Sequence, residues 1–402
     1  WLASQRRGIS LSLAPQTAPF PSVTARAFFG GLLPEGAARR HISQTYGVDD
    51  LDDIALLRLI GHECAGAIRV TSTPVEPGSS RRLIRWMEPD EVRELIHGLR
   101  VPGTTSALDR YSISLAGAQL KRGLIIDRST PDLTVGVPEA DALSTDIVKL
   151  AVAGYAGIVE NEHCMQLLAA TIGLRASTTH VDALGGERVL SVTRYDRTVG
   201  PTTERLHQED MCQALGRLST HKYEKFDPVT GISVGPTIHD MVTLLRARAV
   251  PSIQQVDDLL RLVWFNVIIG NIDAHAKNYS LLYAADMRSF EVAPLYDAIC
   301  VSAYHAGADV AMRHAEEPLV MHIGGQTRFW QLTRADIEGY ARDLGIQPAF
   351  VVRQLKRLID AVDSALDGVI DAAQQSIDSD HPMLDVVRTE IHARCAFLRA
   401  LL

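Results

Sequence analysis

Apolar residues recur at helical spacing in several parts of the chain. Between Val159 and Leu174 they lie three and four positions apart, which predicts a helix, and Gly173 predicts its end. Thr333 and Asp336 have the spacing of a capping box, which predicts the start of another helix. A longer apolar stripe predicts the helix that follows, at Val351, Leu355, Ile359, Val362, Leu366 and Ile370.

The first half of the chain alternates short apolar runs with turn residues. Residues 49–70 predict a helix and then a small-residue turn into a strand. Residues 88–100 predict a helix that ends at Gly98 or just past it. Strands are predicted at residues 146–152 and 188–197, and on both sides of a Gly/Ala turn within 112–127.

This order of elements predicts an α+β protein. A small mixed module comes first, a strand-rich lobe follows, and helices dominate from about residue 206. A β-rich lobe followed by a helical lobe is the layout of a kinase-like fold, here with an additional small α/β N-terminal subdomain. We place the boundaries at residues 1–103, 104–197 and 198–402.

Composition and charge narrow the class of protein. The 402 residues allow a sizeable core, and a net charge of −8 argues against broad binding to nucleic-acid phosphates by this chain alone. The five cysteines are scattered without a C-x-x-C pair, which indicates reduced thiols in a cytoplasm. No apolar run is long enough for a membrane span, and the first residues lack the apolar core of a signal peptide.

The stretch GNIDAHAKN, residues 270–278, concentrates polar groups after an apolar run. Asp273 and Asn278 are five residues apart, as are the catalytic Asp and the metal-binding Asn of kinase catalytic loops. The alternative is that both residues only form a turn. We expect His275, between them, to hold the loop by hydrogen bonding rather than to touch the substrate.

A second carboxylate follows this loop. Residues 279–300 predict a hairpin that delivers Asp297 at a strand end, where a kinase holds its metal ions. The alternative for Asp297 is a helix cap.

The strand-rich lobe supplies a candidate cation. Lys149 lies within an apolar strand, from which it can reach nucleotide phosphates, although an edge-strand lysine can instead block aggregation. Glu160 and Glu162 on the next helix are candidate partners for Lys149, and we prefer Glu162.

The small residues of SISLAGAQLK, residues 112–121, would let backbone N–H groups approach phosphates. Ser112 and Ser114 lie at the mouth of this turn, and a plain tight hairpin is the alternative. The chain contains no G-x-S-x-G, H-E-x-x-H or Rossmann fingerprint.

Taken together these motifs resemble the HipA-type serine/threonine kinases, which are toxins of bacterial toxin–antitoxin pairs. The matching motifs follow the family order from about residue 8 to about residue 325. They are FFGGLLPEG, GHECAGAI, SISLAGAQLK, DIVKL, ENEHC, RYDR, LHQEDMCQALG, KYE, GNIDAHAKN, PLYD and MHIGG.

The resemblance implies a role for each matching residue. Asp273 would be the catalytic Asp, Asn278 and Asp297 the magnesium ligands, and Lys149 the lysine on the ATP phosphates. Residues 192–195 would form the hinge that holds the adenine, although VTRYDR has Thr193 where the family often has Glu. The implied ATP-binding residues are Ala116, Gly117, Ala118, Gln119, Lys121, Lys149, Thr193, Tyr195 and Lys277. Ser114 would be the autophosphorylated serine, and Ser112 a second phosphosite.

The resemblance also implies partners and a location. They are ATP and Mg²⁺, a HipB-like helix-turn-helix antitoxin, and DNA mainly through that antitoxin, with no membrane. The implied substrate is a translation component such as an aminoacyl-tRNA synthetase, for example glutamyl-tRNA synthetase, in the bacterial cytoplasm. Compared with the family, the N-terminal module lacks its first strands, and we favour truncation over a separate protein that supplies them.

Two other functions fit the same residues. One is a kinase-fold co-repressor that mainly holds the antitoxin on operator DNA. The other is a small-molecule kinase.

Overall fold

The computed structural model describes ten stretches of the chain. They are residues 8–72, 82–100, 121–129, 133–152, 154–198, 200, 203–226, 233–305, 316–377 and 381–402. The chain divides into two compact units. Unit 1 comprises Trp1–Val152, Ser177–Glu209 and Leu282–Arg288, and unit 2 comprises Ala153–Ala176, Asp210–Leu281 and Ser289–Leu402.

Unit 1 begins with a small helical module. Three helices pack around one apolar core that includes Phe28, Leu56 and Ile60: α1 (Ser22–Gly31), α2 (Gly36–Tyr46) and α3 (Asp53–Ile60). The 3-10 turn η2 (Gly61–Glu63) follows. The strand predicted next is wrong, because residues 64–72 are irregular and their polar groups bond to side chains from elsewhere in unit 1.

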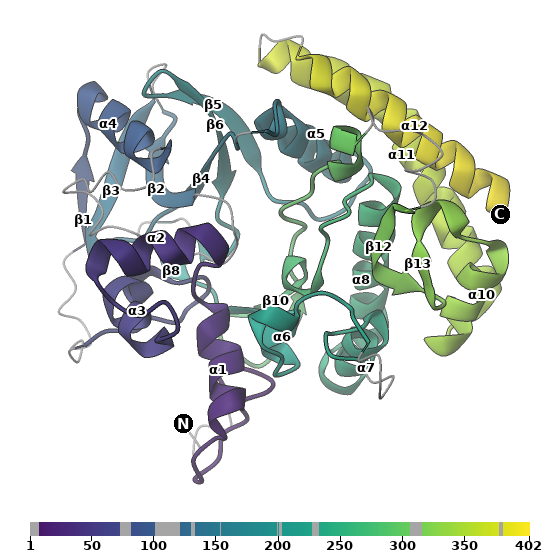
Figure 1. Cartoon of the computed structure of the whole chain (residues 1–402), viewed down its shortest axis with the longest axis horizontal. Coiled ribbons are helices and arrows are strands. Elements are labelled where there is room, and N and C mark those ends of the chain that lie inside the picture. The colour runs from purple at the N-terminus through teal and green to yellow at the C-terminus, as the bar shows by residue number, and fades with distance from the viewer. Residues whose placement is uncertain are drawn as a thin grey trace. The chain divides into compact units, whose positions relative to one another are not determined.

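Unit 1 also contains a six-stranded antiparallel sheet. Its strand order is β1-β3-β2-β4-β6-β5, and α4 (Pro89–Arg100) packs against it through Val92, Leu95 and Ile96 (Figure 1). The strands are β1 (Arg82–Trp86), β2 (Lys121–Asp127), β3 (Thr134–Ala140), β4 (Asp146–Leu150), β5 (Thr179–Leu184) and β6 (Glu187–Thr193). A two-stranded ribbon follows, β7 (Arg197–Thr198) with β8 (Glu204–Arg205).

Unit 2 is mainly helical. Its α-helices are α5 (Ile158–Thr171), α6 (Met211–Ala214), α7 (Ile238–Arg248), α8 (Ser252–Ile268), α10 (Arg334–Asp343), α11 (Pro348–Ser376) and α12 (Pro382–Leu401). Single turns are η4 (Ser219–His221), η5 (Ala276–Asn278), η6 (Val301–His305) and η7 (Phe329–Gln331). Unit 2 also contains the strands β11 (Phe290–Val292), β12 (Pro318–Ile323) and β13 (Gln326–Arg328), whereas β9 (Gln208–Asp210) and β10 (Ser280–Tyr283) each have residues in both units.

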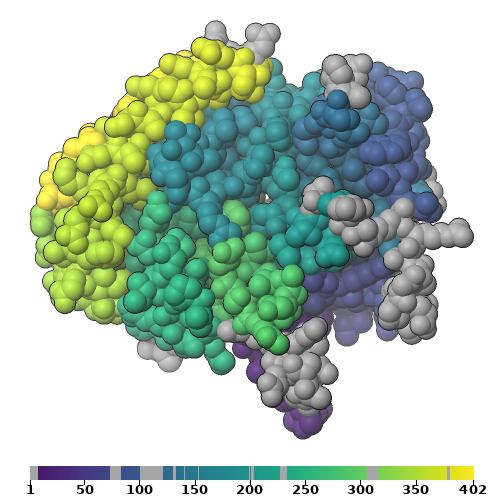
Figure 2. All heavy atoms as spheres, turned by 180° about the vertical axis from the view of Figure 1, so that it is seen from behind, coloured from purple at the N-terminus to yellow at the C-terminus, as the bar shows by residue number. Residues whose placement is uncertain are grey.

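The long helix α11 organises unit 2. All six residues of its predicted stripe are buried, and α11 packs against α5, α8, α10 and α12. Helices α11 and α12 lie side by side along one border of unit 2 (Figures 1 and 2). The predicted capping box on α10 is confirmed, because Thr333 and Asp336 bond reciprocally.

The hairpin predicted after GNIDAHAKN is confirmed, but the position predicted for Asp297 is wrong. Strands β10 and β11 are neighbours, yet β11 already ends at Val292. Pro294 has no N–H to continue the pairing, and Leu295 bonds to Arg175 instead. The chain therefore leaves the hairpin before it reaches Asp297.

All five cysteines are buried free thiols, as predicted. Within the described parts of the chain, no helix combines the length and the apolar character that a membrane crossing requires.

Candidate functional site

The candidate catalytic loop begins where α8 ends. Gly270 adopts a left-handed φ of 70°, and a side chain there would place its Cβ 2.7 Å from the Ser302 hydroxyl oxygen. The Gly270 carbonyl accepts hydrogen bonds from the Ser302 backbone N–H at 3.0 Å and its hydroxyl at 3.1 Å. The glycine is therefore required both by the backbone turn and by the close packing.

Asp273 is exposed at the tip of this loop, as a group that meets a substrate must be. The Tyr223 phenol donates a hydrogen bond of 2.7 Å to its carboxylate. The Tyr223 ring also meets the buried His275 ring edge to face, at 5.2 Å between centroids. Tyr223 thus holds the Asp273 side chain through a hydrogen bond, and His275 packs against the Tyr223 ring.

Asn271 connects the Asp273 loop to the segment that carries Asp297. Its side-chain N–H₂ donates to the Asn266 side chain at 2.8 Å and to the Asp297 carbonyl at 3.1 Å. Its side-chain oxygen accepts from the Asp273 backbone N–H at 3.3 Å. One buried amide therefore fixes the backbones of both candidate acids.

A second bond joins the same two segments. The Tyr296 phenol donates to the Lys277 carbonyl at 2.5 Å, so the residues that precede Asn278 and Asp297 are held together. Asn278 is buried in η5, and Asp297 is half-buried with a left-handed φ of 52°. A non-glycine residue in that region is uncommon and is typical of functional sites.

Asp297 caps no helix in the described structure, since the next helical turn starts at Val301. Asn161 of α5 instead holds the residues that follow, through paired bonds to the N–H and C=O of Cys300 at 2.9 and 3.1 Å. Glu160 and Glu162 are buried on the same helix.

Lys277, one of the predicted ATP-binding residues, lies in η5 directly before Asn278. Its ammonium group is buried and pairs with Asp210 at 3.3 Å. Asp210 also caps α6, so this ion pair links the loop to the start of that helix.

The candidate ATP residues of unit 1 lie on adjacent strands. Lys149 is buried one residue before the end of β4, and Lys121 lies directly opposite it on β2. Directly opposite residues of antiparallel strands point to the same face, so two cations share one patch of the sheet. Thr193 ends β6, and Tyr195 follows two residues later.

Six predicted site residues lie outside the described residues. They are Ser112, Ser114, Ala116, Gly117, Ala118 and Gln119.

A small cavity lies next to the candidate catalytic loop. Its volume is about 20 Å³, and its lining includes Asn266, Asn271, Met321 and Arg394. That space suits one water molecule rather than a nucleotide. Arg394 of α12 is fully buried there and donates to the Val267 carbonyl at 2.8 Å and to Glu317.

Sequence reasoning did not single out Tyr223, Asn271, Asn161 or Arg394. The first three fall within matched motifs, KYE, GNIDAHAKN and ENEHC, so motif membership was a signal for them. Arg394 had no such signal, because its partners are distant in sequence.

Comparison with known proteins defines the chain as a kinase-like phosphotransferase. Two family models match it, the HipA-like C-terminal domain at residues 113–367 and the HipA N-terminal domain at residues 1–71. The chain belongs to the HipA family of serine/threonine kinase toxins, and it is an enzyme of that kinase class.

Individual relatives agree with this assignment. A putative kinase, Y4mE of Sinorhizobium fredii, is 32% identical over 92% of this chain and 85% of its own length. The serine/threonine-protein kinase toxin HipA of Shewanella oneidensis is 26% identical over 92% of this chain and 82% of its own length. Relatives that are kinases imply ATP as the phosphoryl donor in general terms.

A solved structure extends the likeness to the fold. It is a chain in the complex of HipA, HipB and operator DNA from Shewanella oneidensis. It superposes with a TM-score of 0.78 at 25% identity, over 98% of this chain and 91% of that one. The predicted α+β, kinase-like fold is confirmed by this match.

Proposed function

We propose that this kinase transfers phosphate from magnesium-bound ATP to a serine or threonine of a protein. Asp273 orients the attacking hydroxyl and accepts its proton, and Lys149 binds the ATP phosphates. The observation that carries the proposal is the Asn271 amide, which bonds to the backbones of both Asp273 and Asp297. Asp273 would contact the attacking hydroxyl and Asp297 the metal ion on the phosphates. Phosphoryl transfer requires a fixed spacing between two such acids.

Asn278 and Asp297 would hold the magnesium ion. Both supply oxygen atoms, the donors Mg²⁺ prefers, and Mg²⁺ normally completes its shell with water and substrate phosphates. The described residues contain no group of three or more acidic, His or Cys side chains placed to hold a metal. The bound ion would neutralise phosphate charge, while Asp273 and Lys149 position the reacting groups.

The pair of lysines on the sheet supports the assignment of phosphate contacts. Lys121 and Lys149 lie directly opposite each other on antiparallel strands, and Lys149 is only 5% exposed. Side chains at such positions lie on the same face of the sheet, so both ammonium groups would contact one polyanionic ligand such as the ATP phosphates.

The adenine would bind at residues 192–195, near Thr193 and Tyr195, with the Gly/Ala-rich turn at Ala116, Gly117, Ala118 and Gln119 over the phosphates. In this scheme residues 1–103 form the N-terminal subdomain, 104–197 the nucleotide lobe, and 198–402 the catalytic lobe.

Autophosphorylation is the proposed means of self-limitation. A phosphate on Ser114 or Ser112 would carry nearly two negative charges into the region of the ATP phosphates, and like-charge repulsion would oppose nucleotide binding. Ser114→Ala is then expected to stay active, whereas the phosphorylated wild type loses ATP turnover. Equal ATP turnover by phosphorylated and unmodified protein would disprove this role.

The proposed substrate is an aminoacyl-tRNA synthetase, such as glutamyl-tRNA synthetase, and the proposed partner is a HipB-like antitoxin. The relative's structure contains HipA with HipB and operator DNA, which supports the partner. Labelled ATP added with the enzyme to a bacterial lysate should label a synthetase band. Label only in small molecules would favour a small-molecule kinase.

Intact-protein mass spectrometry after incubation with ATP and Mg²⁺ tests the proposed function directly. Wild type should gain one or two phosphates, and Asp273→Gln should gain none. No gain by a wild type that starts unphosphorylated would favour a co-repressor that acts by binding the antitoxin.

A further inference from the structure

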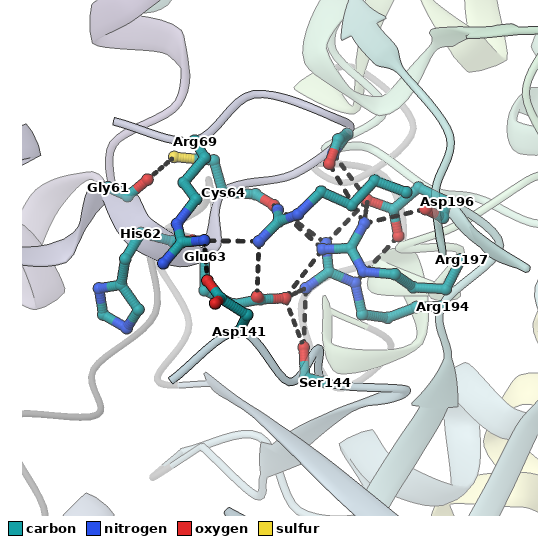
Figure 3. Close-up of polar contacts among 12 residues, drawn as sticks. Gly61, His62, Glu63, Cys64, Arg69, Asp141, Ser144, Arg194, Asp196 and Arg197 are labelled. Carbon is teal, nitrogen blue, oxygen red and sulfur yellow. Dashed lines mark hydrogen bonds and ion pairs between the residues drawn. The ribbon is translucent and has the colours of Figure 1, made fainter. Parts of the chain in front are cut away.

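A network of buried charged groups within unit 1 includes Arg194 of the proposed adenine hinge (Figure 3). It contains two carboxylates and three guanidinium groups, from Glu63, Asp196, Arg194, Arg197 and Arg205. Four of the five residues are at most 5% exposed, Arg205 being the least buried. A buried charge is costly unless it is paired, so these contacts depend closely on one another.

Glu63 is the centre of the network. One of its carboxylate oxygens accepts from Arg194 at 3.0 Å and from Arg197 at 2.8 Å, and the other accepts from Arg205 at 2.9 Å. Although burial alone would raise the pKa of the Glu63 carboxyl, the three arginines hold that pKa below its usual value.

The first oxygen of Glu63 also bonds to the segment that leads into β4, the strand of Lys149. It accepts from the Ser144 hydroxyl at 3.0 Å, and that hydroxyl accepts from Arg194 at 2.9 Å. Ser144 lies two residues before β4, which carries Lys149. The Arg194 backbone N–H donates to the Thr145 carbonyl at 2.8 Å, so Arg194 of the hinge bonds to both residues that precede β4.

The backbone around Glu63 takes part as well. Residues 64–66 are irregular and cannot pair their groups within a helix or strand. The Cys64 carbonyl accepts from Arg194 at 3.2 Å, and the Gly66 N–H donates to Asp196 at 2.7 Å. The motif GHECAGAI is thus bonded to RYDR over about 130 residues of sequence.

Glu63 falls within the match to the HipA N-terminal domain, whereas Ser144 and Arg194 fall within the match to the HipA-like C-terminal domain. We propose that Glu63 is a positioning residue through which the N-terminal module fixes the hinge and the Lys149 strand, and so strengthens ATP binding. This inference rests on the proposed function, because it assumes that residues 192–195 and Lys149 bind ATP.

The test uses the full chain and the variant Glu63→Gln, which keeps the shape of the side chain and removes its charge. The affinity for ATP is measured with Mg²⁺ by calorimetry, and the rate of autophosphorylation is followed as a function of ATP. We expect Kd and KM for ATP to rise about fivefold or more, the effect of losing one charged contact, with an unchanged rate at saturating ATP. Ser144→Ala, which keeps the charge, should shift both constants in the same direction by less.

The control separates positioning from loss of stability. Leu56→Ala removes buried apolar atoms from the same module without touching the network. It should lower the unfolding temperature and the fraction of active enzyme, but leave KM for ATP unchanged.

The outcomes are distinguishable. If wild type binds ATP, and both Glu63→Gln and Ser144→Ala bind it equally well, the positioning role is wrong and the proposed function stands. If Leu56→Ala raises KM as much as Glu63→Gln at equal stability, the role is again wrong. If wild type itself binds no ATP, the proposed function fails, and this inference fails with it.

Discussion

Tyr223 contacts Asp273, the proposed catalytic acid, through its side chain. Its phenol donates to the exposed carboxylate of Asp273 at 2.7 Å, and its ring rests against His275. Tyr223→Phe keeps the ring and removes the hydrogen bond. A hydrogen bond to a charged group contributes about 1.5–3 kcal/mol, so we expect kcat to fall about tenfold or more while KM for ATP stays unchanged.

Tyr155→Phe is the matched control. Tyr155 is 41% exposed in unit 2 and meets Tyr304 through its ring, which the variant keeps. It should react at the wild-type rate. Full activity of Tyr223→Phe would show that Asp273 needs no such support.

Glu224 follows Tyr223 and is buried. Burial raises the pKa of this carboxyl from 4.5 to about 7, although the His322 backbone N–H donates to it at 2.8 Å. Between pH 4.5 and about pH 7, the Glu224 carboxyl is therefore protonated in the folded protein and ionised in the unfolded chain. Stability from this group is therefore complete below pH 4.5 and is lost as the pH rises through 7.

Glu224→Gln removes this dependence, because an amide cannot ionise and can still accept the bond from His322. The variant should be more stable than wild type at pH 8, by at most about 3 kcal/mol, and should match it near pH 4.5. Thermal unfolding at both pH values measures the difference. A variant that is less stable than wild type at pH 8 would contradict the conclusion that ionisation of the buried Glu224 carboxyl destabilises the fold.

At the scale of elements, α11 and α12 face each other through charged side chains as well as an apolar seam. His392 of α12 lies between two acids of α11, 2.7 Å from Asp363 and 3.0 Å from Asp367. Burial opposes its charge, but the hydrogen bonds to Asp367 and Asp363 prevail and raise the pKa of His392. Arg388 pairs with Asp367 and Arg399 pairs with Asp363, so each arginine competes with His392 for one of the two acids.

The raised pKa of His392 predicts the direction of a pH effect on the helix pair. The stabilisation is fully present below the unfolded value of 6.5 and disappears as the pH rises through the folded value. His392→Gln should therefore lower the unfolding temperature at pH 5.5 more than at pH 8.5. His392 and its two acidic partners are partly exposed, so the pH-dependent loss of stability should stay below about 1 kcal/mol. An equal loss at both pH values would mean that only packing is involved.

At the scale of the whole molecule, the chain passes repeatedly between the two units. Residues 177–209 and 282–288 belong to unit 1 although they interrupt the sequence of unit 2. They carry β5 and β6, and β6 pairs with β4. A fragment of residues 153–402 would thus expose an unpaired edge of β6, which is a template for aggregation.

We therefore expect the fragment 153–402 to be largely aggregated under conditions in which the full chain is monodisperse. Size-exclusion chromatography and circular dichroism would compare the two. A monodisperse fragment with cooperative unfolding would show that the helical unit needs none of the missing strands.

The sequence by itself determined the elements whose signals are local. The α11 stripe, the α10 capping box, the strand around Lys149 and the end of α5 at Gly173 all depend on residues a few positions apart. It also determined the family, because the motifs occur in a fixed order. The candidate acids Asp273 and Asp297 were recognised in the same way and stay predictions.

Only the tertiary structure decided how these residues are held. The side chains of Asn271, Tyr223 and Glu63 bond to groups that are distant in sequence, and their residue types alone do not indicate these partners. The prediction of a strand after α3 was wrong for the same reason. The backbone groups of Cys64 and Gly66 bond to the side chains of Arg194, Asp196 and Arg197 rather than to a neighbouring strand. A local pattern records which face of an element is apolar, whereas the partner of a buried polar group is fixed only when distant segments meet.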